Sequence, residues 1–292
     1  MKTVVTGSSG LVGSPLIPLL LRNGHDVGRL QRPSQWNPEI GFLNAAAFTD
    51  ADVVVHLAGE SIAAGRWTAA RKSRIRESRV NGTRLIAETI SRMRRPPEVF
   101  VSASAIGYYG DRGDETLRED SPPGSGFLAD VCQEWEAATD AAVGKRIRVV
   151  HLRTGLVLSK EGGAMGKMLL PFQLGIGGKI GSGHQYWSWI SLEDLCNAIV
   201  HCVSNTSLHG AVNMVSPLPV TNLEFTKALG RVLRRPTLFP LPAFAARAAL
   251  GEMADALLLA SARVEPTKLR NAGFVFKHSE LEPTLRALLS GA

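Results

Sequence analysis

The chain begins with a short strand-like run that leads directly into a glycine-rich turn and an apolar helical pattern. Lys2–Thr6 is rich in β-branched residues, the glycines of Gly7–Gly13 follow a G-x-x-G-x-x-G spacing, and Leu16–Leu21 is apolar at helical spacing. Glycine lets a backbone approach a pyrophosphate closely, and the helix that follows directs free N–H groups and its positive dipole end toward the phosphates. Strand, turn and helix together predict a dinucleotide site, with an ordinary strand–helix turn as the alternative. The residues expected at this site are Gly7, Ser8, Ser9, Gly10, Leu11 and Val12.

Short apolar runs with helical patterns between them recur along the chain. The expected strands are Val4–Thr6, Asp26–Leu30, Val53–Leu57, Val99–Ser102 and Arg148–Leu152. The expected helices are Leu11–Asn23, Trp67–Met93, Leu128–Val143, Met165–Leu174 and Leu192–Ser204. Apolar strands that alternate with helices are typical of a parallel sheet covered on both faces. The sequence therefore predicts an α/β protein with a Rossmann-like, doubly wound parallel sheet and a smaller C-terminal lobe on the substrate side.

The chain is expected to divide into two parts. Residues 1–215 should form the NAD(P)-binding Rossmann domain, with substrate-lobe insertions from about residue 155. Frequent prolines then separate short helical runs, which predicts a small C-terminal module of unknown function over 216–292. Between the second and third expected strands, Pro33 and Pro38 disfavour a full helix, so we expect a loop and a short strand near Phe42.

The chain carries 33 basic and 26 acidic residues, a net charge of +7, and many of the arginines lie between Arg66 and Arg95. Such a cluster suits nucleic acid, an anionic cofactor or substrate, or a solvated helix face. No zinc-finger, RNP or helix-turn-helix signature accompanies it, so we expect no nucleic-acid partner. A largely solvated helix that lends one or two arginines to phosphate is the preferred interpretation.

The cysteine pattern and the hydropathy of the chain indicate the cellular compartment in which the protein is expected. The three cysteines have no C-x-x-C pairing and are expected to be buried reduced thiols in a cytoplasmic protein. Residues 1–20 already form the strand–turn–helix unit, so no secretory signal is expected there. No uncharged apolar run approaches the roughly 20 residues of a membrane span, and we expect neither a membrane partner nor a metal site.

The end of the second expected strand indicates which cofactor is bound. A carboxylate at this place would hold the ribose 2′-hydroxyl of NAD, but the sequence Gly28-Arg29-Leu30-Gln31-Arg32 has none. Arginine binds phosphate bidentately and therefore suits the 2′-phosphate of NADP. Gln31 and Arg32 are expected at the cofactor, and NADP(H) is favoured over NAD(H). Two surface arginines are the alternative.

The third expected strand leads into a second tight turn. Leu57, Ala58, Gly59 and Glu60 follow the strand, and the small residues would let a cofactor pass close to the backbone. His56 falls inside the buried pattern, where a hydrogen-bonded core histidine is favoured over a catalytic one.

Hydroxyl groups gather at the end of the fourth expected strand. Ser102, Ser104, Tyr108 and Tyr109 lie within Val99–Gly110, where a hydride-transfer site needs a donor that polarises a carbonyl. Ser104, Tyr108 and Tyr109 are the candidate catalytic residues, and Ser102 is a candidate cofactor contact. A serine-rich turn with two packing tyrosines is the alternative.

Taken together, these segments resemble the extended short-chain dehydrogenase/reductase superfamily, and more narrowly its atypical epimerase-family branch. The resemblance spans essentially the whole chain, and its most specific block is Gly181–Ile190. It implies an NADP(H)-binding Rossmann domain. By analogy it adds Arg79 and Val157 to the cofactor contacts, alongside Leu57, Ala58 and the N-terminal turn.

One departure from the superfamily concerns its Tyr-x-x-x-Lys motif, in which the lysine lowers the pKa of a proton-shuttling tyrosine. The motif occurs nowhere in this sequence, and alignment back from Glu136 places Leu128 and Cys132 at its two positions. Ser104 still matches the superfamily's carbonyl-polarising serine. Tyr108 or Tyr109 could substitute as acid–base if a nearby arginine lowered the pKa of its phenol. Glu60 and His184 are weaker candidates.

Two hypotheses of function follow. The first is an NADP(H)-dependent oxidoreductase or sugar-nucleotide-type epimerase that acts on an unidentified small carbonyl or hydroxyl compound. The second is a non-catalytic NADPH-binding sensor or scaffold, of which a role in cell division is one version. The protein is expected to be a monomer or a homodimer. The superfamily resemblance implies that a dimer would use the helices expected at Trp67–Met93 and Leu128–Val143.

Overall fold

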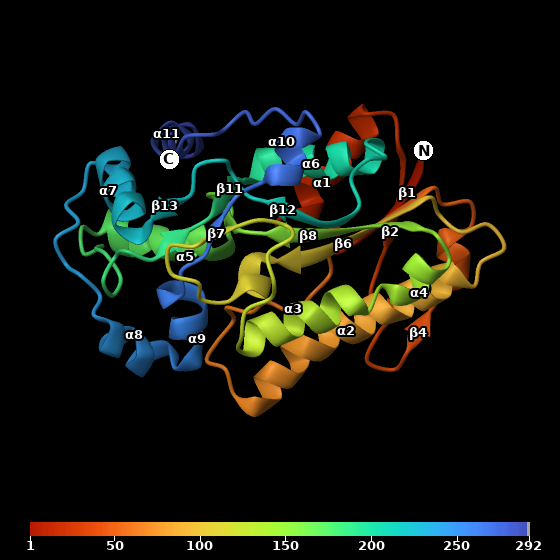
Figure 1. The fold of residues 1–292 in the computed structure, drawn as a ribbon, viewed down its shortest axis with the longest axis horizontal. Coiled ribbons are helices and arrows are strands. Elements are labelled where there is room, and N and C mark those ends of the chain that lie inside the picture. The colour runs from red at the N-terminus through yellow and green to blue at the C-terminus, as the bar shows by residue number, and fades with distance from the viewer. Residues whose placement is uncertain (291–292) are drawn as a thin grey trace.

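A central sheet of six parallel strands organises the computed structural model, which describes residues 1–290 (Figure 1). The strand order is β12-β8-β6-β5-β1-β2, and every neighbouring pair is parallel. The strands are β1 (Lys2–Thr6), β2 (Asp26–Leu30), β5 (Val53–His56), β6 (Val99–Ala105), β8 (Arg148–Thr154) and β12 (Gly210–Met214). The five predicted strands are confirmed, and β12 is an additional edge strand.

Helices cover both faces of the sheet, as predicted for a doubly wound fold. One face carries α1 (Gly13–Arg22) and α6 (Leu192–Ser204), and the other carries α2 (Ala69–Ser91), α3 (Phe127–Ala137) and α4 (Asp140–Gly144) (Figure 1). Val53, Val54 and Val55 of the central strand β5 are completely buried. A strand without a polar face is stable only between two helical layers, and this explains the continuous apolar runs in the sequence.

The strand order reverses direction at β1. From β1 the chain first adds β2 on one side, and then adds β5, β6, β8 and β12 on the other. The chains that leave β1 and β5 lead to helices on opposite faces of the sheet, and in open α/β sheets the ligand crevice lies at such a switch point, at the carboxyl edge.

One predicted helix is interrupted. The pattern over 128–143 predicts a single helix, whereas the structure has α3 and α4 separated at Ala138–Thr139. The Thr139 hydroxyl donates to the Glu136 carbonyl at 2.8 Å and pairs with His151 Nε2 at 2.9 Å. A hydroxyl that bonds to the preceding turn competes with the helical ladder, so the break has a local cause that hydrophobic periodicity does not reveal.

The substrate-side lobe is built from short elements. Its helices are α5 (Gly163–Gln173), α7 (Asn222–Leu233), α8 (Ala243–Leu250), α9 (Glu252–Ala254), α10 (Thr267–Asn271) and α11 (Leu281–Leu289). Two-stranded pairs join β9 (Leu156–Leu158) to β11 (Trp189–Ser191), β10 (Tyr186–Trp187) to β13 (Val220–Thr221), and β7 (Thr116–Leu117) to β14 (Arg263–Val264). A hairpin of β3 (Trp36–Asn37) and β4 (Phe42–Leu43) contains the short strand expected near Phe42.

The C-terminal residues do not have a core of their own. Phe225 and Leu229 of α7 and Leu285 of α11 share one buried cluster with Met165 of α5 and Trp189 of β11. The boundary at residue 215 therefore crosses a shared core, and the two-part division stays a prediction. Within the described residues, no helix combines the length and apolar character needed to cross a bilayer.

One buried carboxylate ties the C-terminal segment to α6. Asp194 is 1% exposed and accepts hydrogen bonds from the backbone N–H groups of Lys277 and His278, each at 2.9 Å. Its neighbour Glu193 reaches the side chains of the same two residues at the exposed surface.

We predict that Asp194→Ala lowers the free energy of unfolding by about 3 kcal/mol, because two part-buried N–H groups lose a charged acceptor. Glu193→Ala is the control and should cost less than about 1 kcal/mol, since exposed ion pairs contribute little. Urea denaturation of both variants tests this. Equal losses would mean that the Asp194 contacts do not hold the segment.

Candidate functional site

The turn after β1 is shaped by glycines that admit no side chain. Gly7 has a φ of +67°, and a Cβ there would lie 2.8 Å from the backbone of Leu57 and Ala58. At Gly13 a Cβ would lie 2.2 Å from the Gly7 carbonyl oxygen. The turn therefore packs against the end of β5 on one side and against the start of α1 on the other. Gly10 is exposed on top of the turn.

The same turn presents unused hydrogen-bond donors. Its internal hydrogen bonds run from the Gly10 N–H to the Gly7 carbonyl and from the Ser14 N–H to the Gly10 carbonyl, both at 3.0 Å. Within residues 1–290 the N–H groups of Leu11 and Val12 have no protein acceptor. Helix α1 has no acidic residue in its first turn to neutralise its positive end. Free N–H groups at an unneutralised helix N-terminus form an anion site.

Gln31 and Arg32 follow β2 directly, at the same edge of the sheet, and both are exposed. The Arg32 guanidinium lies 5.1 Å from the Trp36 ring centroid and 3.8 Å from Glu39, whose side chain is 81% exposed. This loose surface pair leaves the Arg32 guanidinium available to a phosphate. The Gln31 N–H is bonded to the side chain of Gln35.

The turn after β5 is fixed by two arginines of α2. Arg79 donates to the carbonyls of Glu60 at 2.9 Å and Ile75 at 3.2 Å, and its guanidinium lies over the Trp135 ring. Burial lowers the pKa of Arg79. Arg71 pairs with the Glu60 carboxylate at 2.8 Å. Arg79 therefore holds the turn that carries Leu57–Glu60, and the Glu60 side chain already has a partner.

His56 and Ser102 are both completely buried. His56 Nδ1 pairs with the Thr6 hydroxyl at 2.6 Å, whereas its Nε2 has no partner within the described residues. Burial, with a contribution from Arg32, lowers the pKa of His56 to about 3, so the ring is neutral. His56 is thus a core histidine, although only half of it is hydrogen-bonded. The Ser102 side chain reaches no solvent, which argues against a direct cofactor contact.

Ser104 belongs to a buried polar network that joins β6, α3 and β8. Its hydroxyl donates to Glu136 Oε1 at 2.7 Å, and Arg153 grips the same carboxylate through Nε and Nη2 at 2.8 and 2.9 Å. Burial alone would raise the pKa of Glu136, but the hydrogen bonds and charge of Arg153 outweigh it and lower the pKa. Glu136 is therefore ionised and can only accept.

The two tyrosines after Ser104 pack edge to face, with ring centroids 5.4 Å apart, and both lie beside Arg153. Tyr109 is fully buried, donates to Asn213 Oδ1 at 2.7 Å, and accepts from Arg153 at 3.0 Å. Arg153 acts in the expected direction, but burial outweighs it and raises the pKa of Tyr109 to about 12. Tyr108 is half-buried, and the Arg153 guanidinium lies 3.4 Å from its ring centroid. The geometry gives Tyr109 a structural place, whereas Tyr108 is only half-buried and has no hydrogen-bond partner for its hydroxyl within residues 1–290.

The positions aligned with the superfamily's proton relay hold no proton donor. Leu128 packs on Gly107, where an added Cβ would lie 3.2 Å from Leu128 Cβ. Cys132 is 3% exposed, and burial raises the pKa of its thiol to about 12. His184 is exposed in the turn before β10. Val157 lies on β9, packed against the core below the crevice.

The fold and this crevice match known proteins. A model of the NAD dependent epimerase/dehydratase family matches residues 3–214, and a model of a domain of unknown function matches residues 241–288. The chain belongs to the NAD dependent epimerase/dehydratase family. The epimerase family protein ML0860 of Mycobacterium leprae is 42% identical over 288 residues, which cover 96% of this chain and 93% of the relative.

Two solved structures are also similar. The crystal structure of human epimerase family protein SDR39U1 with NADPH is 34% identical, covers 100% of both chains and has a TM-score of 0.91. A nucleoside-diphosphate sugar epimerase from Corynebacterium glutamicum is 34% identical with a TM-score of 0.81, covering 99% of this chain and 58% of that one. The resemblance to the epimerase-family branch is thereby confirmed.

Sequence reasoning missed the partners of Ser104 and Tyr109. Arg153, Glu136 and Asn213 complete the network in this family member, and none of them has a site role predicted from the sequence. The one local signal is that Arg153 directly follows the expected strand Arg148–Leu152, because an arginine that continues a buried strand needs a carboxylate partner. Arg153 is 4% exposed in the structure.

We predict that Glu136→Gln lowers the free energy of unfolding by about 3–5 kcal/mol at neutral pH, because it leaves Arg153 buried without a counter-charge. The pKa of Glu136 is lowered in the folded state, so the ion pair contributes fully above the unfolded pKa and is lost as pH falls through the folded value. The gap between wild type and variant should therefore narrow below about pH 4. Urea denaturation across this range measures it.

Glu134→Gln is the matched control, because Glu134 pairs with Arg76 through side chains that are 45% and 44% exposed. Its effect should stay below about 1 kcal/mol. A Glu136→Gln deficit that keeps the same size from neutral to acid pH would contradict the assignment.

Proposed function

We propose that this protein binds NADP(H) in the crevice between the turn after β1 and the turn after β5. The observation that carries the proposal is the N-terminal turn. Its glycines leave no room for side chains, and the N–H groups of Leu11 and Val12 stand free at the positive end of α1. Free backbone donors without side-chain cover are what a pyrophosphate requires.

Arg32 supports the choice of NADP(H) over NAD(H). Arg32 follows the end of β2, and in this fold the residues at that point contact the ribose 2′-position. The sequence has no Asp or Glu there that would bind the 2′-hydroxyl of NAD(H). Ser8, Ser9, Gly10, Leu11 and Val12 would hold the pyrophosphate. Ala58, Gly59 and Val157 would line the path toward the reacting end, with Arg79 as the residue that positions this turn. The bound nicotinamide would supply or accept hydride.

At the reacting end, Ser104 would accept rather than donate a hydrogen bond. A hydroxyl has one proton, and Ser104 gives its proton to an ionised carboxylate. Its free lone pairs then match a hydroxyl or amide N–H of a ligand. This differs from the carbonyl-polarising role expected from the sequence, and it favours a substrate that offers a hydroxyl group at this point.

Tyr108 is the candidate acid–base group of an oxidoreductase or epimerase reaction. It is half-buried, and the Arg153 guanidinium lies 3.4 Å from its ring centroid, which places a phenol beside a fixed cation at the reacting end. Tyr109 would position Arg153 rather than exchange protons, because its hydroxyl lies between Arg153 and Asn213 without solvent contact.

A second function, NADPH binding without turnover, is favoured by a specific observation. Leu128 and the buried thiol of Cys132 replace the relay, and Ser104, Glu136, Arg153 and Tyr109 already satisfy one another. Such a site could report cofactor occupancy to a partner, as a sensor or scaffold does.

We expect Arg32→Ala to weaken NADPH binding by roughly 10–100-fold while NADH binding changes little, since a charge-assisted contact to phosphate contributes about 1.5–3 kcal/mol. Calorimetric titration with both nucleotides measures it, and Arg94→Ala, which removes an exposed arginine after α2, is the control. Equal loss for both nucleotides would remove Arg32 from the 2′-phosphate. Absence of binding to either by the wild type would overturn the proposed cofactor site.

Turnover separates the two functions. If the protein is an enzyme, a screen of small hydroxyl and carbonyl compounds with NADP⁺ and NADPH should give a change in nicotinamide absorbance that Tyr108→Phe lowers by roughly 100-fold or more. NADPH affinity should stay unchanged in this variant. Tight NADPH binding with no absorbance change across the screen would favour the sensor, and full activity in Tyr108→Phe would exclude Tyr108 as acid–base.

A further inference from the structure

Two long segments of the substrate-side lobe contain no acidic residue. Residues 162–192 hold two Lys or Arg residues and residues 225–251 hold five, and neither segment has an Asp or Glu. In a chain with 26 acidic residues, two such stretches that meet in space favour a cationic surface, in which, within residues 1–290, only Arg231 and Arg247 pair with carboxylates from outside the segments.

The two segments lie against each other in the fold. The Leu241 N–H donates to the Lys179 carbonyl at 2.8 Å, and the Gly181 N–H donates to the Leu241 carbonyl at 2.9 Å. Gly178 lies so close to the Phe239 carbonyl that a Cβ there would be 2.1 Å from its oxygen. The end of α5, the connection from α7 to α8, and α8 therefore form one continuous surface.

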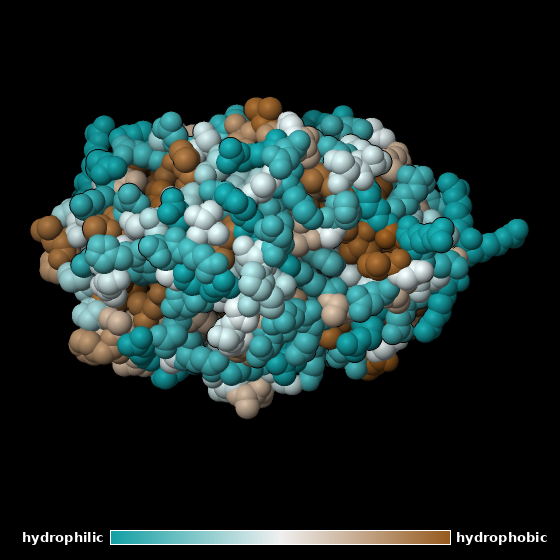
Figure 2. All heavy atoms as spheres, in the orientation of Figure 1, coloured by the Kyte–Doolittle hydropathy of each residue, from teal (hydrophilic) through white to brown (hydrophobic). Residues whose placement is uncertain are grey.

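This surface also exposes large apolar side chains. Leu238 is 76% and Phe244 is 74% exposed. Besides Leu170 on α5, the exposed large apolar side chains of these segments gather around the α7–α8 connection: Leu174, Ile176, Leu238, Phe239, Leu241 and Phe244. Figure 2 shows apolar atoms gathered at the end of the molecule where the α7–α8 connection and α8 lie in Figure 1. We call these six side chains, together with Lys227, Arg234 and Arg235, the acid-free face.

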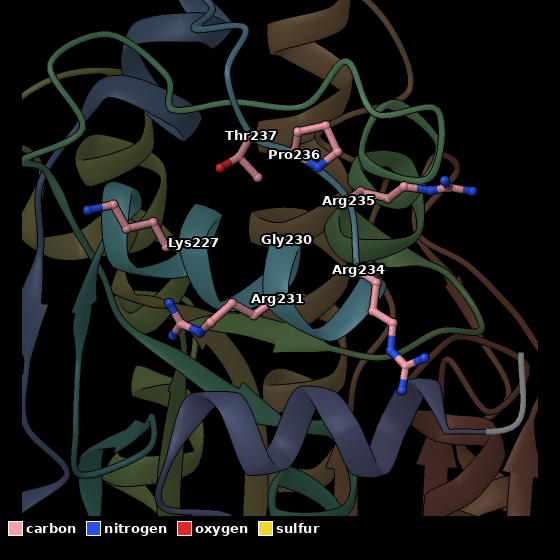
Figure 3. A pocket seen from close by; sticks show the side chains of 7 residues that line it. All are labelled: Lys227, Gly230, Arg231, Arg234, Arg235, Pro236 and Thr237. Carbon is pink, nitrogen blue, oxygen red and sulfur yellow. The ribbon is translucent and has the colours of Figure 1, made fainter.

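The cations of the acid-free face can bind an external anion, but their side chains do not point toward one common site. Within residues 1–290, Lys227, Arg234 and Arg235 form no ion pair, whereas Arg231 is held by Glu282 at 2.6 Å. All four of these cations border an open hollow of about 370 Å³ beside Pro236 and Thr237. Figure 3 shows Arg234 and Arg235 pointing away from Lys227 and from each other. Diverging cations suit an extended anionic surface better than one compact anion.

We propose that the acid-free face docks on the surface of an anionic lipid bilayer. Exposed Phe and Leu side chains insert at the boundary between headgroups and acyl chains, and the surrounding Lys and Arg bind anionic headgroups. Charge complementarity selects this occupant, because three cations without an ion-pair partner in residues 1–290 lie beside exposed apolar side chains. The expectation of no membrane partner was drawn from the absence of a spanning segment, and a peripheral contact needs none.

Vesicle flotation tests the proposal with the full chain. We expect the protein to float with vesicles of phosphatidylcholine containing about one third phosphatidylglycerol at about 0.05 M salt, and not with phosphatidylcholine alone. Each cation near an anionic bilayer strengthens binding by roughly fivefold, so Arg234→Ala with Arg235→Ala should lower partitioning about 25-fold. Leu238→Ser with Phe244→Ser should abolish flotation at about 0.5 M salt, where charge is screened.

Matched variants keep the charge and apolar content comparable. Arg84→Ala with Arg94→Ala removes two exposed arginines elsewhere, and Ile40→Ser with Val275→Ser removes side chains that are 75% and 85% exposed outside the face. Both should float like the wild type. Failure of the wild type to float with anionic vesicles, or equal losses in these controls, would overturn the proposal. So would light scattering that shows an oligomer which the face variants dissociate, because the face would then join two copies.

Discussion

The bidentate pair between Glu136 and Arg153 is the contact on which the reacting end of this fold depends. It joins α3 to β8 across the end of β6, and Ser104, Tyr108 and Tyr109 all take their positions from it. A buried ion pair of this kind adds little net stability over a well-packed apolar pair, but it is costly to break on one side only. Its role here is to orient side chains. The Glu136 carboxylate accepts the Ser104 proton in a hydrogen bond, and the Arg153 guanidinium is held against the Tyr108 ring.

The crevice can keep a cofactor-binding turn and still lack the superfamily's proton relay, because different elements build the two. The cofactor-binding turn depends on backbone geometry at Gly7 and Gly13, and on donors of the turn itself. The relay depends on two side chains of α3, which are Leu128 and Cys132 in this chain. The two halves are set by different elements, so the loss of one leaves the other intact.

The parts that sequence predicts well are those in which the cause is local. The G-x-x-G-x-x-G turn, the apolar runs of β1, β5, β6 and β8, and the span of α6 each follow from neighbouring residues. The network could not be predicted in the same way. Tyr109 and Asn213 are 104 positions apart, and Ser104 meets Glu136 across 32. Whether a tyrosine is half-buried like Tyr108 or enclosed like Tyr109 depends on such long-range partners, and burial then outweighs the effect of the arginine on the pKa of Tyr109.

Charge gives the clearest case of a pattern whose meaning changes in three dimensions. The densest basic cluster of the sequence lies on α2, yet Arg71, Lys72 and Arg76 are paired with Glu60, Glu252 and Glu134. Arg79 is occupied by two carbonyls. The cations of α7 and its following loop divide in the same way: Glu282 pairs with Arg231, whereas Lys227, Arg234 and Arg235 have no ion-pair partner within residues 1–290. The field that an approaching anion meets therefore depends on where carboxylates lie in space as well as on where basic residues cluster in sequence.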